Sequence, residues 1–514
     1  MEAAMRKLYK IIFSRYAICA LMLAAEVVLS VLFCMYAMQY YAVLVAVYIA
    51  VMLISIVGVM NADANPDHKL PWLVIIACFP LVGLIAYSIF RYRRMTRGEE
   101  RRMRESFRSI NEANGVEDKL ALLGIRDSAA AGKAHAVLQD DELAKVYTGT
   151  ASRYFSEGRE LYDSLLSDVL SAEKFIFLEY FIIEEGVMWD GLLSVLKEKV
   201  AAGVEVRVMY DDFGCMSTLP SRYDRRLERC GIRCCRFSKV SPHFRTVYNN
   251  RDHRKIAVID GRVGYTGGVN LADEYINEKL RFGHWKDGGV RISGDATVGL
   301  VALFLSLWEL ASGERDDAKE YMASASQTSS DGGFYIPYGS GPFPAYPRPV
   351  GKNVLLNIIN QAHRYLYLTT PYLIIDYDLT EALRGAAARG VDVRIITPGV
   401  ADKRIVKVMT KSSYPYLIEG GVRIFEYTRG FIHEKTVVSD DLYATVGTIN
   451  LDYRSLVHHY EDGVWMYGTP TVLNIRDSYM KTLADSREIG EREARLGILE
   501  RLVRNAVRLV APLL

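Results

Sequence analysis

Apolar residues are concentrated at the amino-terminal end of the 514-residue chain. Almost every position between Tyr16 and Met60 is apolar, with interruptions at Glu26 and near Gln39. One straight helix of about 45 residues would span roughly 68 Å, which is twice the hydrocarbon thickness of a bilayer. We therefore expect two helical passes joined near Gln39 and, after a polar loop, a third pass; the expected runs are about 16–38, 40–60 and 70–90.

These runs predict a multi-pass helical membrane anchor over residues 1–95. A cleaved signal peptide, the alternative, would need a single short apolar region followed by a cleavage site. Basic residues beside a span mark its cytoplasmic side, and those just after the third run predict a cytoplasmic location for everything downstream: Arg91, Arg93, Arg94, Arg97, Arg101, Arg102 and Arg104. Three crossings would then put the basic residues between Arg6 and Arg15 outside, so the number of crossings and the side of the amino terminus stay open.

Glu26 is the one acidic residue within these runs. Facing lipid at a helix centre, it would cost about 2.5–3.5 kcal/mol. We therefore expect it to face another helix or to lie near an interface.

The rest of the chain alternates between strand-like and helix-like segments and predicts an α/β fold. The same order of strand, helix and strand occurs twice, at 174–183, 189–202 and 204–210 and again at 365–368, 379–389 and 391–396. The nearly identical stretches Gly203–Val208 and Gly390–Ile395 mark an internal duplication. We expect a helical connector at 96–146, a first domain at 147–322, a linker rich in Ser, Gly and Pro at 323–352, and a second domain at 353–484.

Residues 485–514 have the periodicity of a basic amphipathic helix. Packing on the protein and lying on an anionic membrane are both open for such a helix.

One motif is written twice in full. His253, Lys255 and Asp260 are followed by Gly267 and Asn270, and His433, Lys435 and Asp440 are followed by Gly447 and Asn450. Both copies read H-x-K-x4-D-x6-G-x2-N. Two full matches, each closing a similar run of strands and helices, indicate two halves of one functional site.

The spacing within the motif suits phosphate chemistry. Side chains two apart in a strand share a face, so His253 lies beside Lys255 and His433 beside Lys435. One neutral histidine could attack phosphorus and form a covalent intermediate, while the other, protonated, gives a proton to the leaving alcohol. The lysines, with Asn270 and Asn450 as phosphate-binding residues, would stabilise the charge on the phosphate oxygens.

The carboxylates of the two halves have different expected roles. Asp260 and Asp440 complete the motif and are counted with the catalytic set, but they fall at strand ends, where bracing the hairpin by hydrogen bonds is favoured over substrate contact. A carboxylate behind each histidine would fix its tautomer. Asp287 and Glu461, at comparable distances after the two motifs, are the candidates.

Composition argues against two kinds of site, one for nucleic acid and one for a structural metal. The formal net charge is +2 with 24% charged residues, whereas a general nucleic-acid binder shows a plain basic excess, so no nucleic-acid partner is expected. The seven cysteines lack metal-ligand spacing. The chemistry needs no metal, and we expect neither a metal site nor a cofactor.

At these residues the chain resembles the phospholipase D superfamily, which carries paired H-K-D motifs, and within it the bacterial cardiolipin synthases. Supporting stretches are Glu179-Tyr180-Phe181, Tyr210-Asp211-Asp212, Trp285-Lys286-Asp287, Pro371-Tyr372 and Asn450-Leu451-Asp452-Tyr453-Arg454-Ser455. The resemblance covers the chain from about Leu70 onward. Gly268 stands where the family often has serine. The resemblance implies two duplicated phospholipase D-like βα sandwich domains that face each other behind the anchor.

The resemblance also implies an activity. It is the transfer of a phosphatidyl group from one phosphatidylglycerol to the terminal hydroxyl of another at the bacterial cell membrane, giving cardiolipin and glycerol. His253 would be the nucleophile and His433 the acid and base, although the near-symmetry allows the reverse. Anionic membrane lipid is the expected partner, and the oligomeric state is undetermined. A phospholipase D-type hydrolase or transphosphatidylase using water or another alcohol, a nuclease, and a non-catalytic membrane scaffold remain alternatives.

Overall fold

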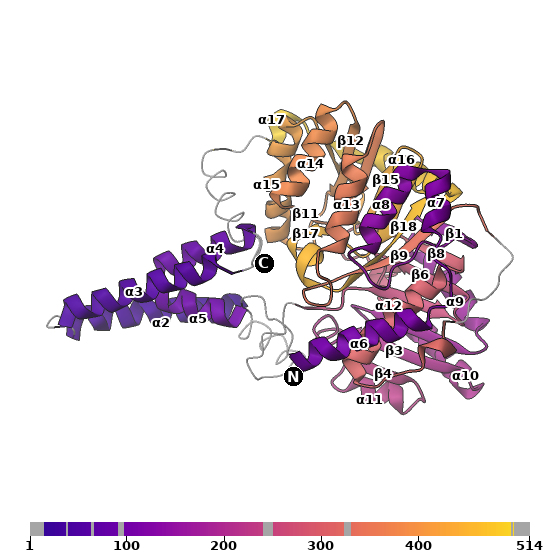
Figure 1. Ribbon diagram of the computed structural model, residues 1–514, viewed down its shortest axis with the longest axis horizontal. Coiled ribbons are helices and arrows are strands. Elements are labelled where there is room, and N and C mark those ends of the chain that lie inside the picture. Colours follow the sequence, from indigo (N-terminus) through magenta and orange to yellow (C-terminus); the bar gives the residue numbers. More distant parts are fainter. Residues whose placement is uncertain are drawn as a thin grey trace. The chain divides into compact units, whose positions relative to one another are not determined.

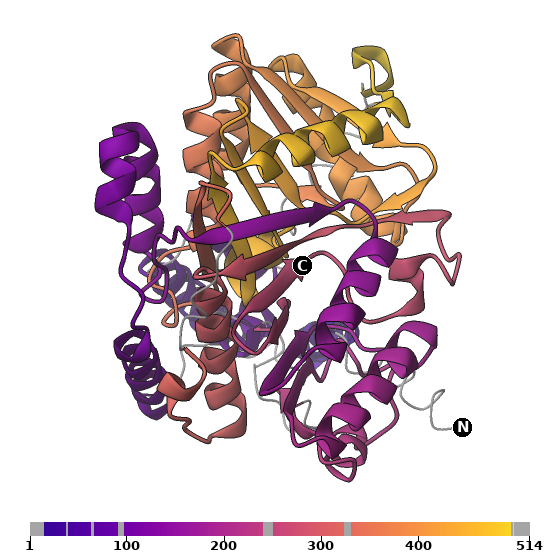
Figure 2. The ribbon, with the colours of Figure 1, turned by 90° about the vertical axis from the view of Figure 1, so that its right-hand side faces the viewer.

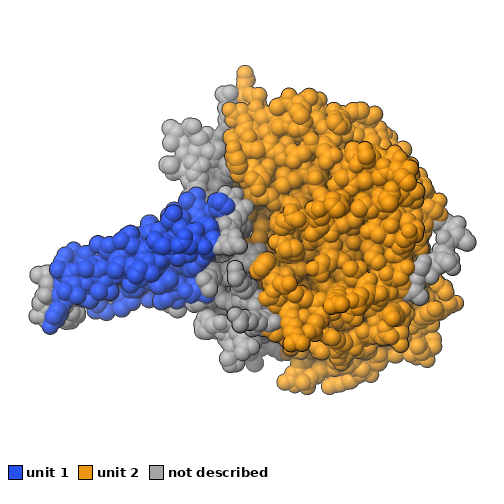
Figure 3. All heavy atoms as spheres, in the orientation of Figure 1, with its two compact units in different colours: residues 1–94, 241–248, 505–514 blue, residues 95–240, 249–504 orange. Residues whose placement is uncertain are grey.

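The computed structural model of the protein describes residues 15–36, 40–62, 66–90, 97–239, 250–322, 330–494 and 497. The chain divides into two compact units, blue and orange in Figure 3: unit 1 holds Met1–Arg94, Ser241–Tyr248 and Asn505–Leu514, and unit 2 holds Met95–Val240 and Asn249–Arg504. The described part of unit 1 is helical, and unit 2 contains every described strand.

Unit 1 is built from the apolar runs of the amino-terminal region (Figure 1). Its helices are α2 (Arg15–Tyr36), α3 (Tyr41–Met60), α4 (Pro66–Cys78) and α5 (Pro80–Phe90). Within the described residues, α3 is the one helix that is long and apolar enough to cross a membrane. In α2 the apolar stretch among the described side chains is shorter, Met22–Leu32. The expectation of three spans is therefore not supported, and one candidate span remains.

The third apolar run, expected as one helix at 70–90, forms two helices. Pro80 has no N–H to donate to the carbonyl four residues before it, so it ends the ladder of α4 and starts α5. A Cβ on Gly83 would lie 2.8 Å from Ile76 Cα, so only a glycine allows this close approach. At 13 and 11 residues, α4 and α5 are each shorter than the roughly 20 residues that a span needs.

Glu26 is held at the start of α5. Its carboxylate accepts a 3.0 Å hydrogen bond from the Val82 backbone N–H and is buried, with 5% of the residue exposed. The first N–H groups of a helix have no partner inside the helix and carry partial positive charge. The contact confirms the expectation that Glu26 faces another helix.

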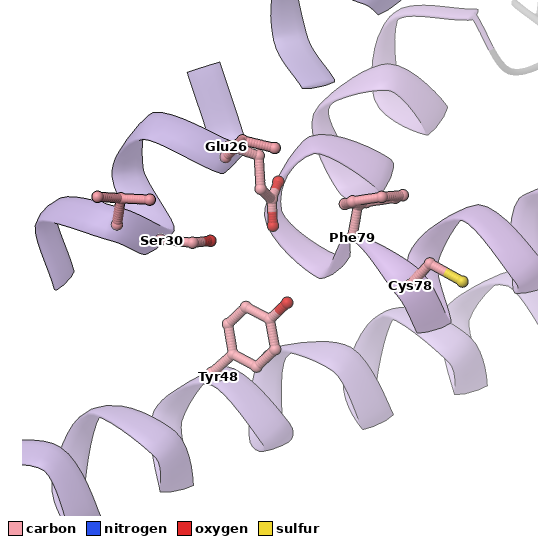
Figure 4. Close-up of a pocket in the computed structure, with 7 residues that line it drawn as sticks. Glu26, Ser30, Tyr48, Cys78 and Phe79 are labelled. Carbon is pink, nitrogen blue, oxygen red and sulfur yellow. The ribbon is translucent and has the colours of Figure 1, made fainter. Parts of the chain in front are cut away.

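A pocket of about 380 Å³ lies beside this carboxylate, lined by Glu26, Val27, Ser30, Val31, Tyr48, Cys78 and Phe79. Figure 4 shows the Glu26 carboxylate and the Tyr48 hydroxyl pointing from different helices toward the same space. The break between α4 and α5 falls at Phe79, so the pocket borders the place where the helix is interrupted.

Three connector helices begin the described part of unit 2: α6 (Arg97–Ala113), α7 (Leu120–Arg126) and α8 (Ser128–Leu138). Met103, Phe107 and Ile110 recur at helical spacing on α6 and are buried in the core. The opposite face carries exposed pairs of arginine and glutamate four residues apart, such as Arg108 with Glu112.

The first half of unit 2 contains a seven-stranded sheet in the order β1-β8-β6-β5-β2-β3-β4. Its strands are, in that order, Thr150–Phe155, Gly289–Gly294, Val263–Gly267, Lys255–Ile259, Phe175–Tyr180, Glu205–Asp211 and Arg233–Phe237. Its helices are α9 (Gly158–Leu170), α10 (Val187–Ala201), α11 (Tyr223–Glu228) and α12 (Thr297–Ser312).

The second half contains an eight-stranded sheet in the order β19-β13-β12-β10-β15-β16-β18-β9. Its strands are, in that order, Ser486–Glu488, Arg423–Tyr427, Asp392–Pro398, Tyr365–Thr369, Thr436–Ser439, Tyr443–Gly447, Glu461–Tyr467 and Phe334–Ser340. Its helices are α13 (Val350–Asn360), α14 (Tyr377–Ala388), α15 (Arg404–Glu419), α16 (Pro470–Ala484) and α17 (Glu491–Ala494).

The two sheets repeat one topology. From β1 to β4 the first has the same order as the second from β9 to β13, and only β19 is extra. In each half the strand that follows the motif histidine pairs antiparallel with a central strand, β5 with β2 and β15 with β10. In Figure 2 the magenta half and the orange and yellow half lie beside each other, each with its own strands and helices. The mixed α/β fold and the duplication agree with the expectation.

Alternating residues of the first sheet enter different cores. Ile256 and Val258 of β5 pack in the core that contains α12 and the second sheet, whereas Ala257 and Ile259 pack in the core beneath α9 and α10. Because side chains of a strand alternate between its faces, a strand buried on both faces reads as a continuous apolar run. This explains why the motif strand was visible in the sequence.

Two boundaries differ from the expectation. Phe334–Ser340, inside the expected linker at 323–352, is the strand β9, which pairs antiparallel with β18 along its whole length. The expected amphipathic helix at 485–514 begins with the strand β19 and the short helix α17; residues 495–496 and 498–514 lie outside the described part. In β9 the strand-forming residues are interrupted by Pro337 and Gly339, and β19 contains only polar residues, so neither strand is evident before its pairing partner is known.

Candidate active site

The two motif histidines stand just before strands β5 and β15. His253 and His433 are both buried, with 7% of each residue exposed. Lys255 Nζ donates a 2.6 Å hydrogen bond to the His253 carbonyl, and Lys435 Nζ donates to the His433 carbonyl. The local geometry of the two copies is therefore the same.

Each histidine is bound by the opposite half of the protein. His253 Nδ1 lies 2.9 Å from Glu461 Oε2, and His433 Nδ1 lies 2.7 Å from Asp287 Oδ2. The backbone follows the same exchange, because His253 N–H donates to the Tyr460 carbonyl and His433 N–H to the Lys286 carbonyl. The structure brings both carboxylate candidates to a histidine, and the partners cross between the halves.

Backbone pairing between the halves supports this exchange. β7 (His284–Lys286) pairs in parallel with β14 (Gly430–Ile432), and Asp252 forms a bridge with Tyr460. Thr266 on β6 also donates a 2.5 Å hydrogen bond to Asp462 on β18. Each motif is thus anchored to the stretch that carries the partner carboxylate.

A carboxylate at Nδ1 fixes the histidine tautomer. The carboxylate accepts a hydrogen bond from Nδ1–H, so the proton stays on Nδ1 and the lone pair of Nε2 remains available. Glu461 is itself held by a 2.5 Å bond from Thr448 Oγ1, and Asp287 by a 2.8 Å bond from the Gly288 N–H. Burial raises the pKa of Asp287 to about 6, so this carboxylate is ionised at neutral pH.

The two histidines are neutral near pH 7 without a bound anion. Burial is the main cause that holds the pKa of His253 and of His433 well below the usual value. The positive charges of Lys255 and Lys435 lower the pKa of both histidines further, each lysine acting on both halves. The four groups therefore form one electrostatic cluster.

The pKa values of the two motif lysines are lowered as well. Burial lowers the pKa of Lys255 to about 8 and that of Lys435 to about 7. Nearby carboxylates oppose this, Glu461 foremost at Lys255 and Asp287 at Lys435. An anion bound between the two ammonium groups would stabilise their charged forms and raise the pKa values of both lysines.

Asn270 and Asn450 are buried at the ends of the two motifs. Asn270 Oδ1 accepts from the Ile182 N–H at 3.0 Å, and its Nδ2 donates to the Tyr275 hydroxyl at 2.7 Å. Asn450 Oδ1 has no hydrogen-bond partner among the described residues. The structure therefore gives both polar atoms of the Asn270 side chain a partner, whereas, among the described residues, Oδ1 of Asn450 is left open to a ligand.

Asp260 and Asp440 lie at the other end of the motif strands. Asp260 accepts three backbone N–H bonds from the stretch Glu173–Phe175, and Asp440 accepts three from His363–Tyr365. The five residues of β5 alone separate Asp260 from His253 by about 16 Å. Such contacts tie the hairpin to the neighbouring strand, and they favour the bracing role over substrate contact.

Aromatic rings surround the histidines. Phe181 lies edge-on to His253, with 5.0 Å between ring centroids. Tyr275 and Trp285 each lie 5.6 Å from His433, and Phe431 lies 6.0 Å from it. These rings exclude water and contribute to the burial that keeps both imidazoles neutral.

His459 was missed in the sequence. It is buried two residues before Glu461, and its ring centroid lies 5.5 Å from that of His253. Burial lowers the pKa of His459 to about 3. The adjacent pair His458-His459 before an acidic residue was the available signal, but it belongs to neither copy of the motif.

The arrangement can perform displacement at phosphorus. It presents two oriented, neutral imidazoles and two buried cations, which supply a nucleophile, a proton carrier and charge stabilisation. None of these four groups needs a metal ion for this chemistry.

Comparisons with known proteins agree with this chemistry. A family model described as "Cardiolipin synthase, PLD-like domain" matches residues 355–483, and one described as "Phospholipase_D-nuclease N-terminal" matches residues 46–91. Among solved structures, phosphatidylserine synthase from Haemophilus influenzae Rd KW20 is similar in fold, with a TM-score of 0.56. The similarity covers 74% of this chain and 100% of that one at 15% sequence identity, so it shows the fold alone.

Sequence relatives cover most of the chain. An uncharacterized protein of Streptococcus mutans is 39% identical over 90% of this chain and 99% of its own length. The cardiolipin synthase of Alkalihalophilus pseudofirmus is 32% identical over 88% of this chain and 90% of that protein. The cardiolipin synthase of Halalkalibacterium halodurans is 31% identical over 91% and 93%. The chain belongs to the cardiolipin synthases, the phosphatidyltransferases of the phospholipase D superfamily.

Proposed function

We propose that the protein makes cardiolipin and glycerol from two phosphatidylglycerol molecules through a covalent phosphatidyl-histidine intermediate. The observation that carries the proposal is the exchanged pairing of the histidines, His253 with Glu461 and His433 with Asp287. It gives each half an oriented imidazole whose position depends on the other half. The names of the relatives support the choice of lipid product.

In the first step, Nε2 of His253 attacks phosphorus of the donor lipid. The new N–P bond forms as the P–O bond to the glycerol headgroup breaks, and His433 gives its proton to the departing oxygen. His433 must be protonated for this step. A bound phosphodiester carries the negative charge that raises the histidine pKa against the effect of Lys255 and Lys435.

In the second step, His433 takes the proton of the terminal hydroxyl of a second phosphatidylglycerol. The hydroxyl oxygen attacks phosphorus, the N–P bond breaks, and His253 is regenerated. Lys255, Lys435, Asn270 and Asn450 stabilise the charge on the phosphate oxygens in both steps. Every proton taken in one step is returned in the other.

The acceptor decides between a synthase and a hydrolase. Water in place of the second lipid would give phosphatidic acid, and the motif residues are the same for both outcomes. The aromatic rings around His433 favour a lipid acceptor, because they restrict water at the histidine that activates it.

The expected location is the bacterial cell membrane with unit 2 on the cytoplasmic side. α3 supplies a candidate span, and the basic residues that follow the apolar region, including Arg101, Arg102 and Arg104, favour that side. A multi-pass arrangement would require further spans beside α3.

Incubation of the purified full chain with phosphatidylglycerol vesicles, followed by mass spectrometry of the lipids, tests the proposal. Cardiolipin and glycerol in equal amounts are expected. Phosphatidic acid without cardiolipin would instead identify a hydrolase. No turnover of phosphatidylglycerol would favour the alternative of a non-catalytic membrane scaffold. A parallel incubation with single- and double-stranded DNA is expected to leave both intact, and cleavage would indicate a nuclease.

A further inference from the structure

Two buried polar atoms beside the nucleophilic histidine lack a hydrogen bond and have only a long contact with each other. His459 Nδ1 and Glu461 Oε1 have no hydrogen-bond partner among the described residues, and they lie 3.7 Å apart. The other oxygen of Glu461 is already used by His253 and Thr448. A buried polar atom without a hydrogen bond destabilises the folded protein, so a further partner for these two atoms is favoured.

The same atoms have the spacing of metal ligands. One ligand atom from each of His253, His459 and Glu461 can be chosen so that all three lie within 4.8 Å of one another, and all three residues are buried. At Zn–N distances of about 2.0–2.1 Å, tetrahedral ligand atoms lie roughly 3.3 Å apart. Glu461 Oε2 lies 2.9 Å from His253 Nδ1 and Glu461 Oε1 lies 3.7 Å from His459 Nδ1, so the two carboxylate oxygens have separations on either side of that value.

We propose that His253, His459 and Glu461 form a site for a divalent transition-metal ion, with Zn²⁺ as the best match, and that the bound ion switches the enzyme off. Two histidines and one glutamate are a known zinc donor set that leaves a fourth position open. One ion would give both unpaired atoms a partner. The switch rests on the proposed function, whereas the binding site does not.

The inhibition follows from the tautomer of His253. In the active form Nδ1 carries the imidazole proton and donates a hydrogen bond to Glu461, so Nε2 keeps the lone pair that attacks phosphorus. An ion bound at Nδ1 takes the lone pair there, and the single proton moves to Nε2. The imidazole stays neutral, but it has no lone pair left for phosphorus.

The second half provides the contrast. His433 and Asp287 are the counterparts of His253 and Glu461, but no third metal-ligating group completes a set with them among the residues that the structure describes. The rings around His433 belong to Tyr275, Trp285 and Phe431. The proposal therefore assigns one ion to each chain, on the side of His253.

Direct metal binding tests the site. Metal-free full-length protein without a histidine tag, in detergent free of phospholipid, is titrated with Co²⁺ while the visible d–d absorption is recorded, and Zn²⁺ is measured by elemental analysis after dialysis. One ion per chain with a tetrahedral Co²⁺ spectrum is expected. The variant His459→Asn is expected to bind about tenfold more weakly or worse, whereas the neighbouring control His458→Asn keeps wild-type affinity. Equal affinity in wild type and His459→Asn would overturn the site.

Turnover tests the switch. Adding Zn²⁺ is expected to lower the kcat of the wild type for phosphatidylglycerol, with recovery after a chelator is added. His459→Asn, compared with its own metal-free rate, should resist the same Zn²⁺ concentration. Full turnover of the metal-loaded wild type would overturn the inhibition. If the metal-free protein has no turnover at all, the proposed function fails, and the Co²⁺ spectrum still decides the site.

Discussion

Glu461 accepts a hydrogen bond from His253, 208 residues before it in the chain and in the other half of the duplication. Asp287 and His433 repeat the contact in the opposite direction. Neither half can therefore orient its own histidine. Two half-sites that depend on each other in this way can work only as one site, which explains why both copies of the motif are complete.

The exchange predicts that the two carboxylates affect the two steps differently. Glu461→Gln replaces the acceptor-only carboxylate at His253 with an amide that can also donate a hydrogen bond, so the tautomer of His253 is no longer fixed and formation of the phosphatidyl-enzyme should slow. Asp287→Asn should instead slow the proton transfers of His433. Each change is expected to lower kcat by roughly 10²- to 10⁴-fold. Single-turnover kinetics with labelled phosphatidylglycerol separate the two, because glycerol release should slow in both variants, whereas Asp287→Asn should also slow transfer from His253 to the second lipid. A normal rate of that transfer in Asp287→Asn would contradict the assigned roles.

The covalent intermediate predicts a trapping experiment. His433→Asn lacks the base for the second step, so a phosphatidyl group that reaches His253 should remain there. Peptide mass spectrometry is expected to find the adduct on the peptide that contains His253. His253→Asn is the matched control and should carry none. An adduct on His433 in that control would show that the roles are reversed.

Buried charges predict a bell-shaped pH profile of kcat/KM, which reports the free enzyme. Asp287, with its pKa raised to about 6, loses its charge as the pH falls below 6, and His433 then loses its fixed tautomer. Lys435 and Lys255, with pKa values lowered to about 7 and about 8, lose their charges as the pH rises through this range, and the phosphate is bound less well.

Lys435→Arg is the control for the alkaline limb. An arginine stays charged in this pH range, so the limb should move to higher pH in the variant, whatever its absolute rate. A limb that stays in place would show that another group sets it. Initial rates in vesicles of constant composition between pH 5 and 9 provide the measurement.

Much of the fold was readable because each half contains complete local signals. The strand after His253 is apolar on both faces, and the β–α–β order around Val204 and Val391 repeats in the sequence. The strand β9 was not predicted, because a stretch containing Pro337 and Gly339 resembles a linker until its partner β18 is known. The pairing of elements distant in the chain cannot be read from local preference.

The site was likewise predictable where it depends on local sequence and not where it depends on the pairing of distant segments. The motif spacing predicted that His253 and Lys255 belong together, and the two carboxylates were found as candidates. Their exchange between halves depends on the pairing of β7 with β14, which joins residues far apart in sequence. His459 became visible only through its distance from Glu461. Pro80 was a sequence signal for the break between α4 and α5, but the continuous apolar run around it led us to expect a single helix.

The bracing role of Asp260 predicts a loss of stability where a catalytic role predicts a loss of turnover. Asp260→Ala removes an acceptor shared by three backbone N–H groups, so the free energy of unfolding should fall by about 2–4 kcal/mol. Asp440→Ala, with the same three contacts in the second half, should behave alike. Thermal unfolding followed by tryptophan fluorescence gives Tm, and the folded fraction of each variant should keep most of its turnover. Unchanged Tm with turnover as low as that of His253→Ala would show that the aspartate takes part in the chemistry.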